Sequence, residues 1–247
     1  TYLKPARGNV VSELESELGV PVFIDNDSSL VALAELKFGK ARNRKNSMVI
    51  NIGWGVGLGM ILNGELFRGN NGFAGEFSHI PIFTNNKICG CGKSGCLETE
   101  TSLLVIIDKA IKGIKEGKST SLKDISMDHP EAAAHSIIEA ALHGDSFSID
   151  LITEVGYNIG RGVAILIHIL NPELIVLSGR GSLAGRLWRA PIQQAINKLC
   201  IPKIAEDTTI EISQMNYQAE IIGTACLVMD QIDKRKFLLT HEKSLIS

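Results

Sequence analysis

Three cysteines and one histidine are gathered in residues 72–98, the stretch of the chain that carries the most chemistry. Cys89, Cys91 and Cys96 lie within eight residues, and His79 precedes the first of them by ten residues. Three thiolates and one imidazole complete the tetrahedral shell of a structural zinc site. Glycines between the cysteines allow the tight turns that this spacing requires. The sequence therefore predicts a zinc ion held by these four side chains.

Unpaired surface thiols or a local disulfide are the alternatives for the same cysteines. Cysteines separated by one residue rarely reach disulfide geometry, and three clustered thiols leave one without a partner. The other two cysteines, Cys200 and Cys226, are far apart in the sequence and suit a reducing compartment. Zinc is therefore the favoured interpretation.

A polar binding surface is predicted beside the metal. Glu76 and His79 are three residues apart and share one face if this segment forms a helical turn. A histidine has two ring nitrogens, so His79 could bind the metal through one and donate to a ligand hydroxyl through the other. Glu98 follows Cys96 by two residues. Our hypothesis is that the metal holds this surface in place.

A second polar group is predicted where a strand meets a helix. Residues 21–25 are expected to form a buried strand that runs into Asn26 and Asp27, and residues 28–39 a helix capped by Asp27 or Ser28. In open α/β folds, ligands bind at the carboxyl ends of strands. From the local sequence, Asp27 is equally well interpreted as a ligand-binding residue and as a simple helix cap.

The remaining pattern predicts an α/β protein with a mixed sheet. A helix is expected at 9–19 and a glycine-punctuated β-meander at 47–69, with its hairpin turn at Asn63-Gly64. The segments that follow alternate between helix and strand: helices at 97–117, 131–144, 146–170, 183–200 and 219–236, and strands at 173–182 and 208–215. Gly156, Gly160 and Gly162 are expected to permit close packing of a helix on the sheet.

The composition indicates a compact globular protein that does not bind nucleic acid by charge. The chain has 247 residues, 45% hydrophobic and 21% charged, with a formal net charge of −2. The longest apolar run, at 163–170, is too short to cross a bilayer, and the first residues lack the apolar core of a signal peptide. We therefore expect a cytoplasmic protein with no membrane partner. Because the chain begins without methionine, we interpret it as a fragment.

Four segments together resemble the ROK family of bacterial sugar kinases and sugar-responsive transcriptional repressors. They are IDNDSS at 24–29, residues 50–80, CGCGKSGCLE at 89–98 and NPELIVLSG at 171–179. The resemblance implies an actin/hexokinase-like (ribonuclease H-like) fold, with mostly the C-terminal lobe and an incomplete N-terminal lobe. The domains expected from it are a remnant of the N-terminal lobe at 1–26, a sugar- and zinc-binding lobe at 27–217, and a closing helix and tail at 218–247 that pack back on the N-terminal lobe.

The resemblance also implies site residues. In the family, the positions that match Asn26, Asp27, Glu76, His79 and Glu98 hold sugar hydroxyls, and those that match His79, Cys89, Cys91 and Cys96 bind zinc. In the kinases, the position of Asp27 is the general base that takes the proton from the sugar hydroxyl attacking ATP, with magnesium. All of these residue types are present here.

Departures from the kinase pattern affect phosphate binding. The Asp-x-Gly-x-Thr phosphate loop of the family is absent, because the chain starts downstream of it. Where kinases have Gly-Thr-Gly, this chain has Gly53-Trp54-Gly55, and an indole offers one N–H donor in place of a hydroxyl. Ser178-Gly179-Arg180-Gly181 also differs from the plain glycine run that kinases present to the nucleotide. These changes are expected to hinder the binding of ATP, and they leave the sugar-binding residues unchanged.

The interpretation favoured by this asymmetry is the effector-binding portion of a repressor, which binds a sugar or amino sugar. The first alternative is a sugar kinase with Asp27 as its base, which would require ATP and magnesium. The second is a zinc-stabilised module without a ligand. For the repressor, DNA is expected to be bound only through a helix-turn-helix upstream of Thr1. The family suggests a homodimer or homotetramer.

Overall fold

A five-stranded mixed sheet forms the centre of the molecule. The computed structural model describes residues 9–245, with side chains up to residue 233. The strand order is β3-β2-β1-β4-β5, with β1 antiparallel to β2 and parallel to β4. The strands are β1 (Ser47–Ile52), β2 (Val56–Leu62), β3 (Glu65–Phe67), β4 (Leu174–Ser178) and β5 (Thr209–Ile212). The predicted meander and mixed sheet are confirmed.

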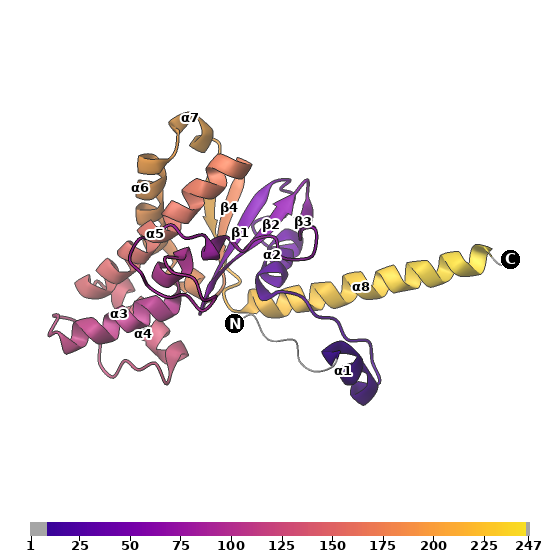
Figure 1. The fold of residues 1–247 in the computed structure, drawn as a ribbon, viewed down its shortest axis with the longest axis horizontal. Coiled ribbons are helices and arrows are strands. Elements are labelled where there is room, and N and C mark those ends of the chain that lie inside the picture. The colour runs from indigo at the N-terminus through magenta and orange to yellow at the C-terminus, as the bar shows by residue number, and fades with distance from the viewer. Residues whose placement is uncertain (1–8, 246–247) are drawn as a thin grey trace.

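Helices cover both faces of this sheet (Figure 1). Alternate side chains of a strand point to opposite faces, so Met48 and Val49 of β1 belong to two different cores. Met48 packs with the long helix α5, whereas Val49 packs with Val31 and Ala32 of α2. The helices are α1 (Val10–Leu18), α2 (Asp27–Phe38), α3 (Leu103–Lys115), α4 (Pro130–Leu142), α5 (Ser146–Leu170), α6 (Arg189–Leu199), α7 (Pro202–Ala205) and α8 (Gln218–Leu245). Short 3₁₀ helices are η1 (Phe77–His79), η2 (Leu97–Glu100) and η3 (Arg180–Trp188).

The glycines of α5 pack against helix α6 and against side chains of the 3₁₀ helices η1 and η2. A Cβ atom at Gly160 would lie 2.6 Å from the Cβ of Ala195, and one at Gly156 would lie 2.7 Å from Pro191 Cγ. Gly162 faces Leu97 and Phe77 instead, at 2.6 and 3.0 Å. The predicted use of these glycines for close packing is confirmed, but the predicted helix–sheet contact is wrong.

The segment at 21–25 is not a strand, contrary to the prediction. It has no regular secondary structure, and the Ile24 side chain is 75% exposed. A strand is stable only when a neighbouring strand satisfies its backbone N–H and C=O groups, and none of the five strands of the sheet pairs with this segment. Helix α1, just before it, forms where predicted, but it buries no side chain within the described part of the chain.

Helix α8 begins at Gln218 and packs its first turns on α2. A Cβ atom at Gly223 would lie 1.9 Å from the carbonyl oxygen of Leu30, so only glycine permits this approach. The helix then continues to Leu245, beyond its predicted end, and projects away from the body (Figure 1). The predicted domain boundaries stay predictions.

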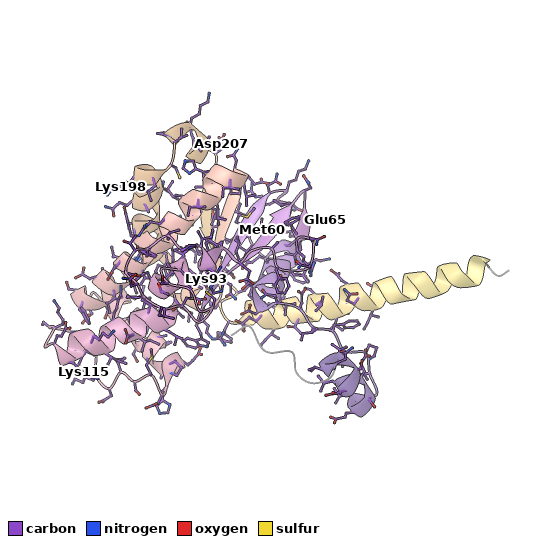
Figure 2. All side chains as sticks on the ribbon, in the orientation of Figure 1. Met60, Glu65, Lys93, Lys115, Lys198 and Asp207 are labelled. Atoms are coloured by element: carbon purple, nitrogen blue, oxygen red, sulfur yellow. The ribbon has the colours of Figure 1, made fainter. Side chains whose placement is uncertain are left out.

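Several charged side chains lie at the outer ends of the body. Figure 2 shows Lys115, Lys198 and Asp207 at the periphery, where all three are exposed. Within the residues that the structure describes, no helix has both the length and the apolar character needed to span a bilayer.

Candidate functional site

A cavity of about 220 Å³ opens where the parallel strands β1 and β4 end. The five residues predicted to hold sugar hydroxyls all line it: Asn26, Asp27, Glu76, His79 and Glu98. This volume is below the usual range for drug-sized ligands, so the cavity suits a small molecule. The structure therefore brings residues from three separate segments to one place, and the bound ligand stays a prediction.

Asn26 caps helix α2, and this corrects the prediction that Asp27 or Ser28 is the cap. The Asn26 side-chain oxygen accepts hydrogen bonds from the backbone N–H groups of Ser28 and Ser29, at 2.9 and 3.2 Å. Asp27 is the first helical residue, and its Oδ1 accepts from the Ser28 N–H at 2.6 Å and from Ser28 Oγ at 3.1 Å. The negative charge of Asp27 is favourable at the start of a helix. Its carboxylate is thereby oriented beside the cavity.

Glu76 and His79 lie on one helical turn, as predicted. Glu76 precedes η1, and its Oε2 lies 3.6 Å from Nε2 of His79. The other ring nitrogen, Nδ1, lies 3.4 Å from Cys89 Sγ. His79 therefore directs one nitrogen towards the cysteines and the other towards the acid of the cavity wall.

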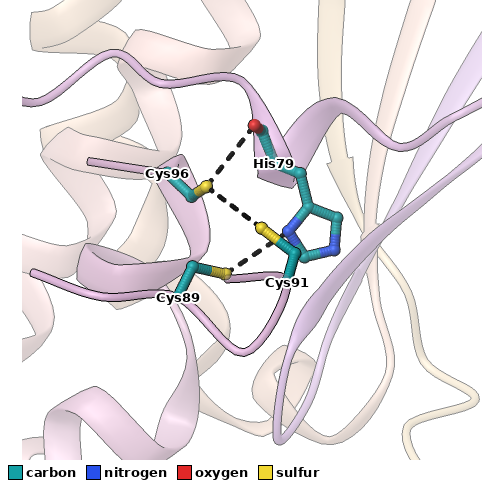
Figure 3. A group of neighbouring side chains, drawn as sticks. All are labelled: His79, Cys89, Cys91 and Cys96. Carbon is teal, nitrogen blue, oxygen red and sulfur yellow. Dashed lines mark hydrogen bonds between the residues drawn. The ribbon is translucent and has the colours of Figure 1, made fainter. Parts of the chain in front are cut away.

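The four predicted metal ligands form a compact cluster (Figure 3). The ligand atoms of His79, Cys89, Cys91 and Cys96 all lie within 4.8 Å of one another, and Cys91 Sγ is 3.6 Å from Cys96 Sγ. Bonds of about 2.3 Å from zinc to sulfur in a tetrahedral shell place two sulfurs about 3.8 Å apart. The donor set and its spacing therefore fit one ion with a soft, closed coordination shell.

The three thiols differ in how readily they ionise. Burial raises the pKa of the Cys96 thiol to about 12, and a hydrogen bond with Cys91 adds to the effect. Burial likewise raises the pKa of Cys89, whereas the backbone N–H of Lys93 lowers the pKa of Cys91. A divalent cation would lower the pKa of all three thiols, because a coordinating thiol loses its proton. Metal binding at this cluster is therefore expected to release protons.

Glu98 connects the cysteine cluster to the glycine loop of residues 53–57. Its Oε2 accepts from the backbone N–H of Val56 at 3.3 Å, and its Oε1 lies 3.7 Å from Cys89 Sγ. A Cβ atom at Gly55 would lie 2.6 Å from Glu98 Oε2, which explains why glycine occupies that position. The carboxylate thus lies between the cysteines and the cavity.

Sequence reasoning missed several lining residues. Asn51 is 5% exposed, and its Nδ2 donates to Ser28 Oγ at 3.4 Å. An asparagine inside the apolar strand SMVINI was the signal that could have revealed it. Glu220 comes from α8 and pairs with Arg180 across forty residues of sequence. No local pattern marks that pairing.

Comparisons with known proteins identify relatives of two kinds. A model described as the ROK family matches residues 4–231. The chain is 36% identical over 220 residues to a glucokinase of Halalkalibacterium halodurans; the match covers 89% of this chain and 67% of the glucokinase. It is 32% identical over 224 residues to a xylose repressor of Caldicellulosiruptor bescii; the match covers 90% of this chain and 55% of the repressor. The chain therefore spans only about half the length of the repressor.

Solved structures show the same division. A ROK family transcriptional regulator, a homologue of the E. coli MLC protein, has a TM-score of 0.76 at 33% identity, over 88% of this chain and 54% of that one. A ROK family glucokinase from Streptomyces griseus in complex with glucose and AMPPNP has a TM-score of 0.79 at 28% identity, over 88% and 71%. The predicted family and the predicted actin/hexokinase-like fold are confirmed.

Proposed function

The chain belongs to the ROK family, and we propose that it is the effector-binding portion of a sugar-responsive repressor of that family. One observation carries the proposal. The complete set of sugar-site residue types lines one cavity, while Trp54 and Arg180 occupy the wall where kinases of the family bind phosphate. The site keeps the means to hold a sugar and has lost features that serve a nucleotide.

Sugar hydroxyls are matched by the polar groups of the cavity. We assign the carboxylates of Asp27, Glu76 and Glu98 as acceptors from these hydroxyls, because ionised acceptors form the stronger hydrogen bonds. Since the Asn26 oxygen is engaged by the helix cap, its amide N–H₂ is the group left to donate. His79 is assigned to donate through Nε2. Both donors and acceptors are therefore available, as a polyol requires.

Zinc is the metal we assign to His79, Cys89, Cys91 and Cys96. Three thiolates and one imidazole form a closed shell, so the ion serves a structural purpose. With Nδ1 bound to the metal, the His79 ring is fixed in orientation and Nε2 carries the proton. Glu98 follows the ligand Cys96 by two residues, and its carboxylate accepts from the backbone N–H of Val56. The metal would thus keep the His79 ring in position beside this carboxylate.

Trp54 and Arg180 support a sensor over a kinase. The guanidinium carbon of Arg180 lies 5.6 Å from the centroid of the Trp54 ring, and the arginine is also paired with Glu131 and Glu220. An indole covered by a paired arginine cannot replace the threonine hydroxyl of the kinase loop as a phosphate ligand. Protein groups would therefore occupy the side of the cavity that kinases of the family use for phosphate.

A repressor of this kind would respond to sugar through a shift in population. If the closed form of the lobes binds the sugar better than the open form, the sugar increases the closed fraction. DNA would be read by a helix-turn-helix upstream of Thr1, in a homodimer or homotetramer. The specific effector is one of the sugars or amino sugars that the wider family binds.

A sugar kinase is the second candidate, and two observations favour it. The relative with 36% identity is a glucokinase, and Asp27 lies at the cavity as a base should. In that case Asp27 would take the proton of the attacking hydroxyl, with ATP and magnesium bound at the wall of Trp54 and Arg180.

The test combines binding and turnover. The intact protein should bind glucose, xylose or N-acetylglucosamine in calorimetry and should show no sugar-dependent hydrolysis of ATP in a coupled assay. Steady phosphorylation of any of these sugars would establish the kinase instead. The sequence upstream of Thr1 is an independent check, because a helix-turn-helix there supports the repressor and an Asp-x-Gly-x-Thr loop supports the kinase.

A further inference from the structure

Arg180 and two carboxylates form an ion-paired cluster at the cavity wall, here called the Arg180 cluster. The arginine Nε donates to Glu131 Oε2 at 3.2 Å, and Nη1 donates to Glu220 Oε1 at 2.9 Å. Its guanidinium also lies over the ring of Trp54. Arg180, Glu220 and Trp54 line the cavity together with the proposed sugar residues. A ligand in the cavity therefore meets this cluster.

Three separate elements hold the cluster in place. Glu131 lies in the first turn of α4 and Glu220 in the first turn of α8, where the helix dipole favours a negative charge. Arg180 follows Gly179, whose close approach to Asn51 leaves no room for a side chain, since a Cβ atom would lie 2.1 Å from Asn51 Oδ1. The arginine is thus committed to its two carboxylates before any ligand arrives.

The charge of the cavity lining is negative. Asp27, Glu76, Glu98 and Glu220 supply four carboxylates, and Arg180 is the one Lys or Arg side chain among the described lining residues. The positive charge of Arg180 is already matched by Glu131 and Glu220. In a cavity of about 220 Å³, an anionic group on a ligand cannot keep far from all of these acids.

We propose that the Arg180 cluster makes this site selective for uncharged sugars and excludes their phosphate esters and uronic acids. The inference rests on the proposed sugar site and adds the charge of its ligand. A phosphate at this wall would meet an arginine whose charge is already matched by Glu131 and Glu220, and it would be repelled by the other carboxylates of the lining. An uncharged hydroxymethyl group is not repelled.

Calorimetry on the intact protein tests this with matched ligand pairs. The pairs are glucose and glucose 6-phosphate, and N-acetylglucosamine and its 6-phosphate, with glucuronate as an anion of nearly the size of glucose. Each anion is expected to bind at least tenfold more weakly than its neutral partner. Glucuronate separates charge from bulk, because its carboxylate is much smaller than a phosphate.

A double variant tests whether the cluster is responsible. Glu131→Gln with Glu220→Gln removes both ion pairs while keeping the side-chain shapes. In the double variant, the ratio of the dissociation constants of the anionic and the neutral ligand should fall at least threefold for each ligand pair. Glu139→Gln, on the same helix as Glu131 and outside the cavity lining, is the matched control and should leave this ratio of dissociation constants unchanged. Circular dichroism confirms that each variant is folded.

The outcomes distinguish the inference from the proposed function. A phosphate ester that binds the unmodified protein as tightly as its neutral sugar overturns the inference, whatever the variants do. An unchanged difference in a folded double variant rejects the Arg180 cluster as the cause. If neither neutral nor anionic sugars bind, the proposed sugar site itself fails.

Discussion

Replacement of Asp27 by asparagine tests the centre of the proposed sugar site. The substitution removes one negative charge and keeps nearly the same shape. An asparagine can still accept from the Ser28 N–H, and the cap of α2 belongs to Asn26, so the helix should keep its N-terminus. The variant is therefore expected to change ligand affinity without a large change in stability.

The magnitude follows from the hydrogen bonds of the carboxylate. Oδ1 is engaged by Ser28, and no hydrogen bond from another described residue reaches Oδ2, which leaves it for a ligand hydroxyl. A hydrogen bond to a charged group contributes about 1.5–3 kcal/mol. Because Asp27 is exposed at the mouth of the cavity, we take the lower value of ~1.5 kcal/mol, which is roughly a tenfold rise in Kd.

Calorimetric titration of Asp27→Asn with the sugar that binds the unmodified protein measures this effect. Asp25→Asn is the matched control, because Asp25 lies two residues away, pairs with Arg68 and does not line the cavity. The control should bind sugar normally. Equal affinities for Asp27→Asn and the unmodified protein would refute the assignment of Asp27 as a sugar ligand, and so would an equal loss in the control.

Further substitutions test the metal cluster and the fold. Cys91→Ser should lose about one zinc per chain in metal analysis and weaken sugar binding, since the metal holds His79. Acidification should also release the metal, because thiols must lose their protons to bind it. Gly160→Ala should destabilise the protein by about 1–3 kcal/mol in urea unfolding, because the new methyl group meets Ala195. Asp145→Ala should cost about 1–2 kcal/mol, since Asp145 caps α5.

The loss of stability caused by Asp145→Ala should depend on pH, and its direction follows from the pKa of Asp145. Burial opposes ionisation, but hydrogen bonds from the backbone N–H groups of Ser121 and Ser148 outweigh it and hold the pKa of Asp145 well below its usual range. Its stabilisation is therefore present above the unfolded pKa of about 3.9 and is lost as the pH falls through the folded pKa. The gap between variant and unmodified protein should shrink in strong acid; a gap that widens there would contradict the assignment.

Metal-free protein after careful preparation would argue against the zinc assignment, as would a Cys91→Ser variant that retains the ion. For Gly160→Ala, an unchanged or raised unfolding midpoint would show that α5 and α6 have room for a methyl group. Helix propensity alone favours alanine over glycine by roughly 0.5–1 kcal/mol, so the predicted loss tests packing.

The elements could be predicted largely because their signals are local. The turn at Asn63-Gly64, the apolar period of α5 and the glycines around the cysteines depend on neighbours a few residues away. The failures have two different causes. The segment at 21–25 has the composition of a strand, but a strand requires a partner that local composition cannot supply. The cap of α2 was misplaced by one residue for the simpler reason that Asn26 and Asp27 are both good caps.

What the sequence by itself determined is the set of chemical groups: the close-spaced cysteines, the histidine and acid three residues apart, and the asparagine–aspartate pair at a helix start. What the tertiary structure alone decided is their convergence on one cavity and the identity of the other residues that line it. Arg180 pairs with Glu131 and Glu220, which lie some forty to fifty positions away in the sequence, and no periodicity links the three residues. Such pairings arise from the packing of α4 and α8 around the sheet. Packing depends on the whole chain, and this is why it could not be read from any one segment.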